Sequence, residues 1–215
     1  MDTQGFYKEV VVVPGNNFPV FWDVLDKIRK AQRNNYASVV LNLNDYSQNQ
    51  IKTISGFCKN LYEFSFVAKY FYNKNEKRLH LTLQAMSDIV GFFNGEWLEG
   101  YVFMKLLKHF YESKGLFSCL RSFNIQFANE DKYEVDVFFR INGRIPVFIG
   151  YNSGEFRRFI EKYRKIRRRL DIEPENLLLL VFGVSDEPLA GLTKMYDITL
   201  VKEVSFVKHV IGLIA

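Results

Sequence analysis

The sequence predicts an α/β (α+β) protein in which a mixed central sheet is flanked by helices and preceded by a small winged-helix-like segment. Hydrophobic residues make up 48% of the 215 residues, which is enough for a sizeable packed core. Asn142-Gly143 lies between two alternating apolar runs, a pattern typical of a β-hairpin. From Trp97 onward the patterns follow the order α-β-β-β-α-β-α-β-α, which indicates helices on both sides of a mixed sheet.

Residues 1–84 are expected to form the winged-helix-like segment. Apolar residues at helical spacing after Pro19 predict a helix to about Asn34, and Ser47 is placed to cap a second helix. This segment either binds nucleic acid or serves as a dimerisation or spacer module. The few cations of the second helix favour the second role. The strands expected here are Phe64–Tyr72 and Arg78–Leu83, and Ser38–Leu43 fits either a short strand or a helical turn.

Residues 85–215 are expected to form the larger domain. A helix should stop near Asn94-Gly95, a typical helix end. Ser153 is placed to cap a basic helix that follows the hairpin. The further elements expected are a helix at Trp97–Ser113, strands at Phe117–Phe127, 133–141, 145–152, Leu177–Val184 and Ile198–Val201, and helices at Glu187–Tyr196 and Glu203–Leu213.

Positive charge is concentrated in one segment. The chain has a net charge of +5, but residues 153–170 hold eight cations and two acids, a net of +6, so the rest sums to −1. Charge gathered on one helix is typical of a phosphate-binding surface, with a solvated Arg-rich face as the alternative. The residues expected to contact nucleic acid are Arg157, Arg158, Lys162, Arg164, Lys165 and Arg168.

Two acids lie on the first strand of the predicted hairpin. Glu134 and Asp136 are two residues apart and therefore point to the same face of the strand. An acidic strand that is paired with a strand leading into a basic helix is the arrangement of metal-dependent nucleases. In such a nuclease the second strand carries a carboxylate and a lysine. Here it ends in Gly150 and Asn152.

The element order is similar to the restriction-endonuclease-like, or PD-(D/E)xK, fold, and two local strings strengthen the likeness. Phe93-Asn94-Gly95-Glu96-Trp97-Leu98-Glu99 resembles the entry to the nuclease domain of CARF-containing CRISPR-associated nucleases. Pro146–Gly154 resembles their second hairpin strand, where the family shows Glu-Cys-Lys-Thr-Gly. The resemblance covers about residues 85–215. Residues 1–84 are too few for a CARF sensor plus a winged helix, so activation by a ring nucleotide is not expected.

The resemblance implies a role for each matching residue. Asp136 would be the main metal ligand, Glu99 the helix carboxylate, and Glu134 a supporting acid. Mg²⁺ or Mn²⁺ would be the cofactor if a metal is bound at all, with no cofactor as the alternative. Metal ions of this kind require several oxygen ligands, so Gly150 in place of a carboxylate weakens the site.

The second departure removes a charge. Asn152 replaces the lysine, and losing one such electrostatic contact costs on the order of 10²–10³ in rate. Glu155 could supply a replacement carboxylate and Arg157 or Arg158 a replacement charge. Glu155 in the first turn of a helix is equally an ordinary partner of the helix dipole.

The sequence leaves three functions open. The first is a nuclease-fold protein with a degenerate metal site that binds DNA or RNA with weak or no catalysis. The second is an active endonuclease rebuilt from Glu99, Asp136 and Glu155. The third is a protein-assembly module. A protein partner and a homodimer are further options.

No apolar run reaches the about 18 residues that span a bilayer, and Cys58 and Cys119 lack metal-type spacing, so a cytoplasmic location is expected.

Overall fold

The structure is a computed structural model that describes residues 7–129, 132–143, 145–152, 157–182 and 189–214. Side chains of residues 7–9, 152 and 157–159 lie outside this description. The chain forms two compact units, Met1–Tyr101 and Val102–Ala215. Each unit is described by itself, and the division into domains at residue 84 stays a prediction.

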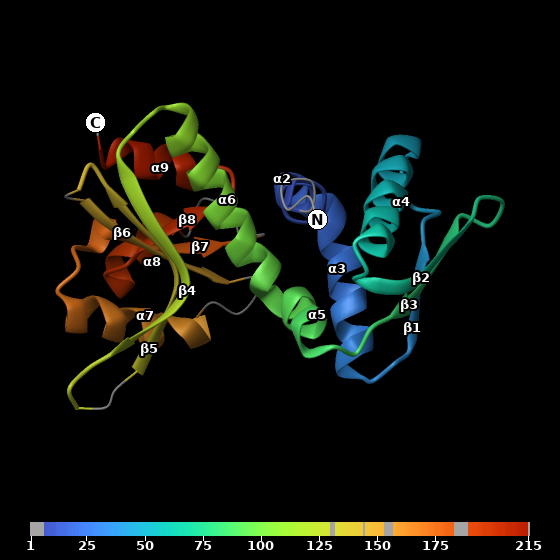
Figure 1. Ribbon diagram of the computed structural model, residues 1–215, viewed down its shortest axis with the longest axis horizontal. Helices are drawn as coiled ribbons and strands as arrows, with labels where there is room; N and C mark the ends of the chain where they lie inside the picture. Colours follow the sequence, from blue (N-terminus) through green and yellow to red (C-terminus); the bar gives the residue numbers. More distant parts are fainter. Residues whose placement is uncertain (1–6, 130–131, 144, 153–156, 183–188, 215) are drawn as a thin grey trace. The chain divides into compact units, whose positions relative to one another are not determined.

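The first unit is a three-stranded antiparallel sheet with helices on one side (Figure 1). The strand order is β1-β3-β2, so β3 is central. Its elements are η1 (Tyr7–Val12), α2 (Val13–Asn16), α3 (Phe18–Arg33), β1 (Ser38–Asn42), α4 (Gln48–Glu63), β2 (Val67–Asn73), β3 (Arg78–Leu83), α5 (Ser87–Gly91), η2 (Phe92–Glu96) and the start of α6 (Trp97–Glu112).

Local sequence explains where these helices begin. Pro19 lies in the first turn of α3, where its missing N–H has no intrahelical partner to lose. The Ser47 hydroxyl accepts a hydrogen bond from the Gln50 backbone, and the Gln50 side chain accepts one from the Ser47 backbone. This capping box confirms the predicted start of α4. Ser38–Leu43 is a strand over Ser38–Asn42. The winged-helix interpretation stays a prediction.

The predicted helix end near Asn94-Gly95 is confirmed. Gly95 has non-helical backbone angles, and the chain kinks there before α6 begins at Trp97. The φ angle of Gly95 is 146°, which glycine tolerates because it has no Cβ. Asn94-Gly95 therefore marks a change of backbone direction between two helices that follow each other without a loop.

The second unit contains a five-stranded mixed sheet in the order β4-β5-β6-β7-β8. β4, β5 and β6 are antiparallel neighbours, and β6, β7 and β8 are parallel neighbours. This confirms the predicted α+β class with a mixed sheet flanked by helices. Its elements after α6 are β4 (Phe117–Gln126), β5 (Lys132–Ile141), β6 (Ile145–Asn152), α7 (Arg157–Leu170), η3 (Pro174–Asn176), β7 (Leu177–Val181), α8 (Leu189–Tyr196), β8 (Thr199–Lys202) and α9 (Phe206–Gly212).

A turn at Asn142-Gly143 joins β5 and β6, as the sequence predicts, and both residues have the positive φ angles, 52° and 68°, that an Asn-Gly turn favours. The expected two-residue loop is wrong by one position, because Ile141 pairs with Ile145. This turn sets the register in which Val137 faces Ile149. A shift by one residue would turn every side chain of β5 to the opposite face, so the turn decides which way Asp136 points.

The two faces of this sheet bury different helices. On one face, Phe139 packs against Phe103 and Phe110 of α6, with ring centroids 5.7 Å apart in both pairs. On the other face, α7 buries Ile160, Tyr163 and Ile166 in a cluster with Leu177 and Leu179 of β7. Each such burial contributes roughly 1.5–3 kcal/mol. These contacts hold α7 over β6 and β7.

Among the described residues, no helix is long and apolar enough to cross a membrane.

Candidate functional site

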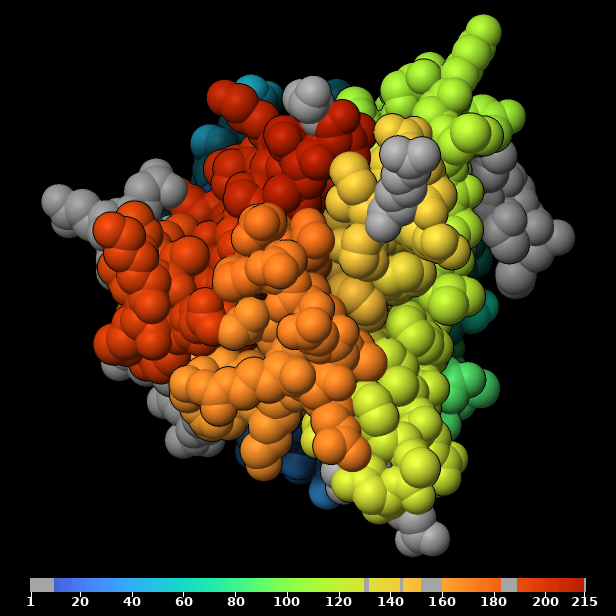
Figure 2. All heavy atoms as spheres, turned by 90° about the vertical axis from the view of Figure 1, so that its left-hand side faces the viewer, coloured from blue at the N-terminus to red at the C-terminus, as the bar shows by residue number. Residues whose placement is uncertain are grey.

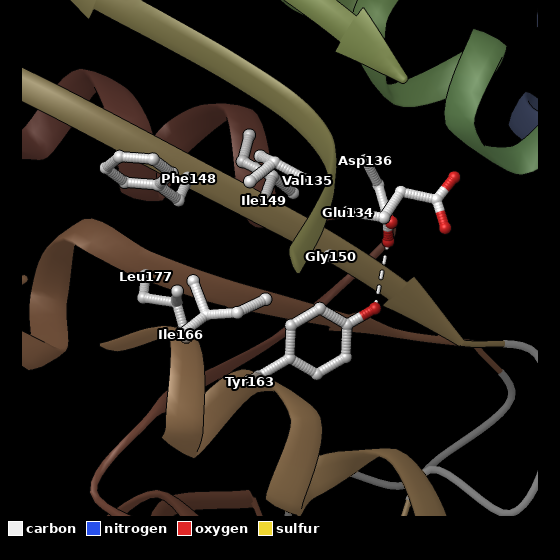
Figure 3. A pocket seen from close by; sticks show the side chains of 9 residues that line it. All are labelled: Glu134, Val135, Asp136, Phe148, Ile149, Gly150, Tyr163, Ile166 and Leu177. Carbon is white, nitrogen blue, oxygen red and sulfur yellow. Dashed lines mark hydrogen bonds between the residues drawn. The ribbon is translucent and has the colours of Figure 1, made fainter. Parts of the chain in front are cut away.

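The candidate site lies where β5 and β6 run side by side and α7 packs against them (Figure 3). Asp136 on β5 and Gly150 on β6 both line one small cavity. The Tyr151 N–H donates to Oδ2 of Asp136 at 3.3 Å, which ties the acid to the neighbouring strand. Asn152 follows on β6, at the position paired with Val181 of β7. The three positions of the family motif therefore share one sheet, as the resemblance requires.

Two side chains of α7 hold the Asp136 carboxylate. The Tyr163 hydroxyl donates to Oδ2 at 2.9 Å (Figure 3). The Lys162 ammonium lies 3.4 Å from Oδ1 and forms an ion pair with it. The Asp136 side chain is only 10% exposed, whereas that of Lys162 is 34% exposed. A buried carboxylate without partners would be costly, so these donors are what permits Asp136 to lie here.

Burial also shifts the acid–base behaviour of the pair. Loss of hydration raises the pKa of Asp136 above its ordinary 3.8, and attraction to Lys162 and the hydrogen bond from Tyr163 oppose this rise. Burial, together with the neighbouring Asp136 carboxylate, raises the pKa of Tyr163 well above 10. Tyr163 therefore keeps its proton at neutral pH and acts as a hydrogen-bond donor.

Gly150 is required by the ring of Tyr163. A Cβ atom built on Gly150 would lie 2.2 Å from Cε1 and 2.6 Å from the hydroxyl oxygen of Tyr163. The aromatic ring thus occupies the space into which a side chain at position 150 would extend. The cavity that remains is about 10 Å³, room for about one water molecule.

The described residues do not fit a divalent metal ion. Such an ion needs several oxygen ligands, and no cluster of three or more histidine, cysteine or acidic side chains suited to a metal occurs among them. Glu134 lines the cavity but is exposed on β5. The ammonium of Lys162 already neutralises Asp136. A metal ion would have to displace this cation.

Glu99 and Asp136 share one property. Within the described part of the chain, they are the buried charged residues, with 6% and 8% of the whole residue exposed. Glu99 belongs to the first unit and Asp136 to the second. Buried acids are rare and concentrate at functional sites, so the two carboxylates singled out by the resemblance lie in unusual environments. Glu155 lies outside the described residues.

The basic residues of α7 divide into paired and exposed ones. Arg164 forms an ion pair with Glu161 at 2.6 Å. Arg167 forms one with Asp197 and donates to the Ile172 carbonyl oxygen at 3.0 Å, so it has a structural role. The side chains of Arg157 and Arg158 lie outside the described residues. The exposed cations are Lys165, Arg168 and Arg169, and the last packs over the Phe127 ring. Figure 2 shows this face, with α7 in orange.

Sequence reasoning missed the part played by α7 in the site. Lys162 was expected to contact nucleic acid, yet it and Tyr163 both hold Asp136. A signal was present, because Tyr163 carries a hydroxyl group among the buried apolar residues of α7. Tyr and Trp that are buried usually find a hydrogen-bond partner. The sequence could not show which partner, since the contact joins positions that are 27 residues apart.

Comparisons with known proteins identify the fold and not the family. No protein-family model and no curated protein matches the sequence. Two similar solved structures each have a TM-score of 0.60. One is protein VC1899 from Vibrio cholerae, at 16% identity over 98% of this chain and 55% of that one. The other is Can2 from Sulfobacillus thermosulfidooxidans, in complex with cyclic tetra-adenylate, at 11% identity over 93% of this chain and 53% of that one.

Two conclusions follow from these comparisons. The chain shares its fold with Can2 and with protein VC1899 over most of its own length. It spans about half the length of either solved chain, so activities and ligands of those proteins do not transfer with the fold.

Substitution of Gly150 tests the close packing of Tyr163. Gly150→Ala should lower the free energy of unfolding by about 1–3 kcal/mol, because the new Cβ overlaps the ring. Gly150→Ala combined with Tyr163→Leu should cost less than the sum of the two single changes. Urea unfolding of the four proteins measures this. Gly56→Ala, whose Cβ would meet nothing within 4 Å, is the matched control and should be neutral or stabilising. If the effects of the two single changes on the free energy of unfolding add strictly, the packing of Tyr163 against position 150 is contradicted.

The raised pKa of Asp136 predicts a particular pH dependence. The folded protein binds this proton more tightly than the unfolded chain, so the contribution of Asp136 to stability falls as the pH rises from about 4 through the raised pKa. Asp136→Asn lacks this titration. The stability of the wild-type protein relative to the variant should therefore shrink over that interval and then stay constant, as measured by denaturant unfolding from about pH 4 to 8. If the stability difference instead grows with pH, attraction to Lys162 outweighs the loss of hydration in setting the pKa of Asp136.

Proposed function

We propose that this chain is a nuclease-fold protein that binds nucleic acid through α7 and has weak or no catalytic activity. The observation that carries the proposal is the state of Asp136, whose carboxylate is held by Lys162 and Tyr163 in a nearly filled cavity. In this proposal Asp136 corresponds to the metal-binding acid of a nuclease centre, and its pairing with Lys162 in a nearly filled cavity supports the loss of the ion.

The reasoning against catalysis starts from charge. Metal-dependent phosphodiester cleavage relies on an ion that neutralises the phosphate and activates a water molecule. In this chain the charge of Asp136 is already balanced by Lys162, and position 150 offers no carboxylate. Hydrolysis of a phosphodiester at this site would therefore lack both the ion and the space for the reacting phosphate.

The reasoning for binding rests on α7. Its apolar stripe is buried against β7, so the opposite side of the helix faces solvent. That side carries Lys165, Arg168 and Arg169 as exposed cations. Arginine and lysine arranged along one helix face suit a row of phosphates, and releasing counterions from the nucleic acid supplies the binding free energy. The cyclic tetra-adenylate of Can2 is likewise a phosphate-bearing ligand.

A second candidate is an active Mg²⁺- or Mn²⁺-dependent endonuclease with a rearranged site. The burial of Asp136 favours it, since a buried acid is the kind of ligand that such a site would use. Glu155 would complete the ligand set. This candidate requires Asp136 to exchange Lys162 for a metal ion.

Binding through α7 is tested by changing its exposed cations. Lys165→Ala with Arg168→Ala should weaken binding to DNA or RNA and reduce the slope of log K against log salt by about 2, because each lost phosphate contact removes about 0.9. Fluorescence anisotropy across a salt series measures this. Lys30→Ala with Lys59→Ala removes the same charge from exposed positions in the first unit and is the control. Equal effects of the two double variants, or a flat salt response in the wild type, would contradict the proposal.

Cleavage separates the two candidates. With Mg²⁺ or Mn²⁺ and single- or double-stranded DNA or RNA, we expect product formation at the level of a protein-free blank, because the Asp136 site offers too few ligands. Gel analysis of labelled substrates checks this. Robust cutting that disappears in Asp136→Ala would replace the first candidate with the second. Cutting that survives Asp136→Ala would point to a contaminating nuclease.

A further inference from the structure

The three-stranded sheet of the first unit has one open face. Leu41, Leu79 and Leu81 are buried on the side that α3 and α4 cover (Figure 1). Because side chains alternate along a strand, the residues between them point to the other side. Among the described residues of this unit, no helix or strand packs on that side. The open face therefore consists of alternate residues of β1, β3 and β2.

A row of apolar and aromatic side chains crosses the middle of the open face. The strand register places Val40 and Phe71 on either side of His80. Phe71 is 61% exposed and Val40 is 50% exposed. The rings of Phe71 and His80 have centroids 5.9 Å apart. Two neighbouring flat rings are thus presented to solvent on a rigid sheet, where exposed apolar groups of this size commonly mark an interaction site.

Cations and hydrogen-bonding groups surround this row. On one side the register aligns Lys69 with Thr82 and Ser38. On the other side it aligns Arg78 with Asn42 and Asn73, and Arg78 forms an exposed pair with Glu76 at 3.6 Å. An exposed pair of this length contributes little, so Arg78 can turn to another anion. The face therefore combines flat rings at its centre with positive charge at both ends.

The size of the face restricts what can bind there. Three strands about 4.8 Å apart and five residues long, at about 3.3 Å each, cover about 240 Å². A stable protein–protein interface buries about 800 Å² on each partner. The open face alone is too small for such an interface. Its dimensions suit two or three bases laid flat with their phosphates at the margins.

We propose that this face binds single-stranded nucleic acid, with bases stacked on Phe71 and His80 and phosphates contacted by Lys69 and Arg78. The site is separate from α7 and does not depend on it. Bases in a duplex are already stacked on each other, so only unpaired bases can lie on these rings. Stacking on an aromatic ring accepts any base, and the contact chemistry is common to RNA and DNA.

The test compares single-stranded and duplex oligonucleotides of about eight nucleotides, in RNA and DNA, by fluorescence anisotropy. Phe71→Leu keeps an apolar side chain but removes the ring, and should weaken single-strand binding about fivefold or more while leaving duplex binding unchanged. Phe71→Tyr should retain single-strand binding. Tyr62→Leu removes another exposed aromatic, on α4, and is the matched control that should have no effect.

Each outcome bears on the proposal. A loss in Phe71→Leu that Phe71→Tyr and Tyr62→Leu do not share supports it, whether or not the α7 double variant binds normally. Unchanged single-strand binding in Phe71→Leu overturns it, even if the α7 variant loses binding. An equal loss for duplex also overturns it. Size-exclusion chromatography of Phe71→Leu completes the test, because a change of oligomeric state with unchanged binding would assign the face to a second copy of the chain.

Discussion

The ring of Tyr163 lies against the backbone of Gly150, and its hydroxyl reaches Asp136. This contact joins three requirements of the second unit. It allows α7 to approach the sheet closely, it supplies a hydrogen bond to a buried carboxylate, and it fills the space beside that carboxylate. Lys162, one residue earlier on the same helix, supplies the charge that the buried acid needs. The position of α7 therefore decides both how the sheet is covered and what Asp136 can bind.

The position of Asp136 and the chemistry available to it depend on different residues. The hairpin turn at Asn142-Gly143 and the apolar residues of β5, β6 and β7 hold Asp136 in place. The chemistry depends on the few side chains around it. With glycine at position 150, the space beside Asp136 is open to the Tyr163 ring of α7.

The helix in which the net positive charge is concentrated serves two purposes in this arrangement. Arg167 ties α7 to Asp197 and to the carbonyl oxygen of Ile172, which stabilises the second unit. Lys165 and Arg168, by contrast, are exposed to solvent. A count of charges along the sequence treats these residues as equivalent. Their distances to neighbouring side chains separate them into structural and solvent-facing groups, and only the second group can meet a ligand at low cost.

The sequence by itself determined most of the secondary structure, the turn residues of the hairpin and the mixed sheet, because these follow from hydrophobic periodicity and from turn residues that act over a few positions. The structure decided the hairpin register, which differs by one residue from that of a two-residue turn. Only the tertiary structure decided that Tyr163 fills the space at Gly150 and that Lys162 pairs with Asp136. These contacts depend on how α7 crosses the sheet, and that crossing is set by side-chain packing between segments distant in the chain, which no local pattern encodes.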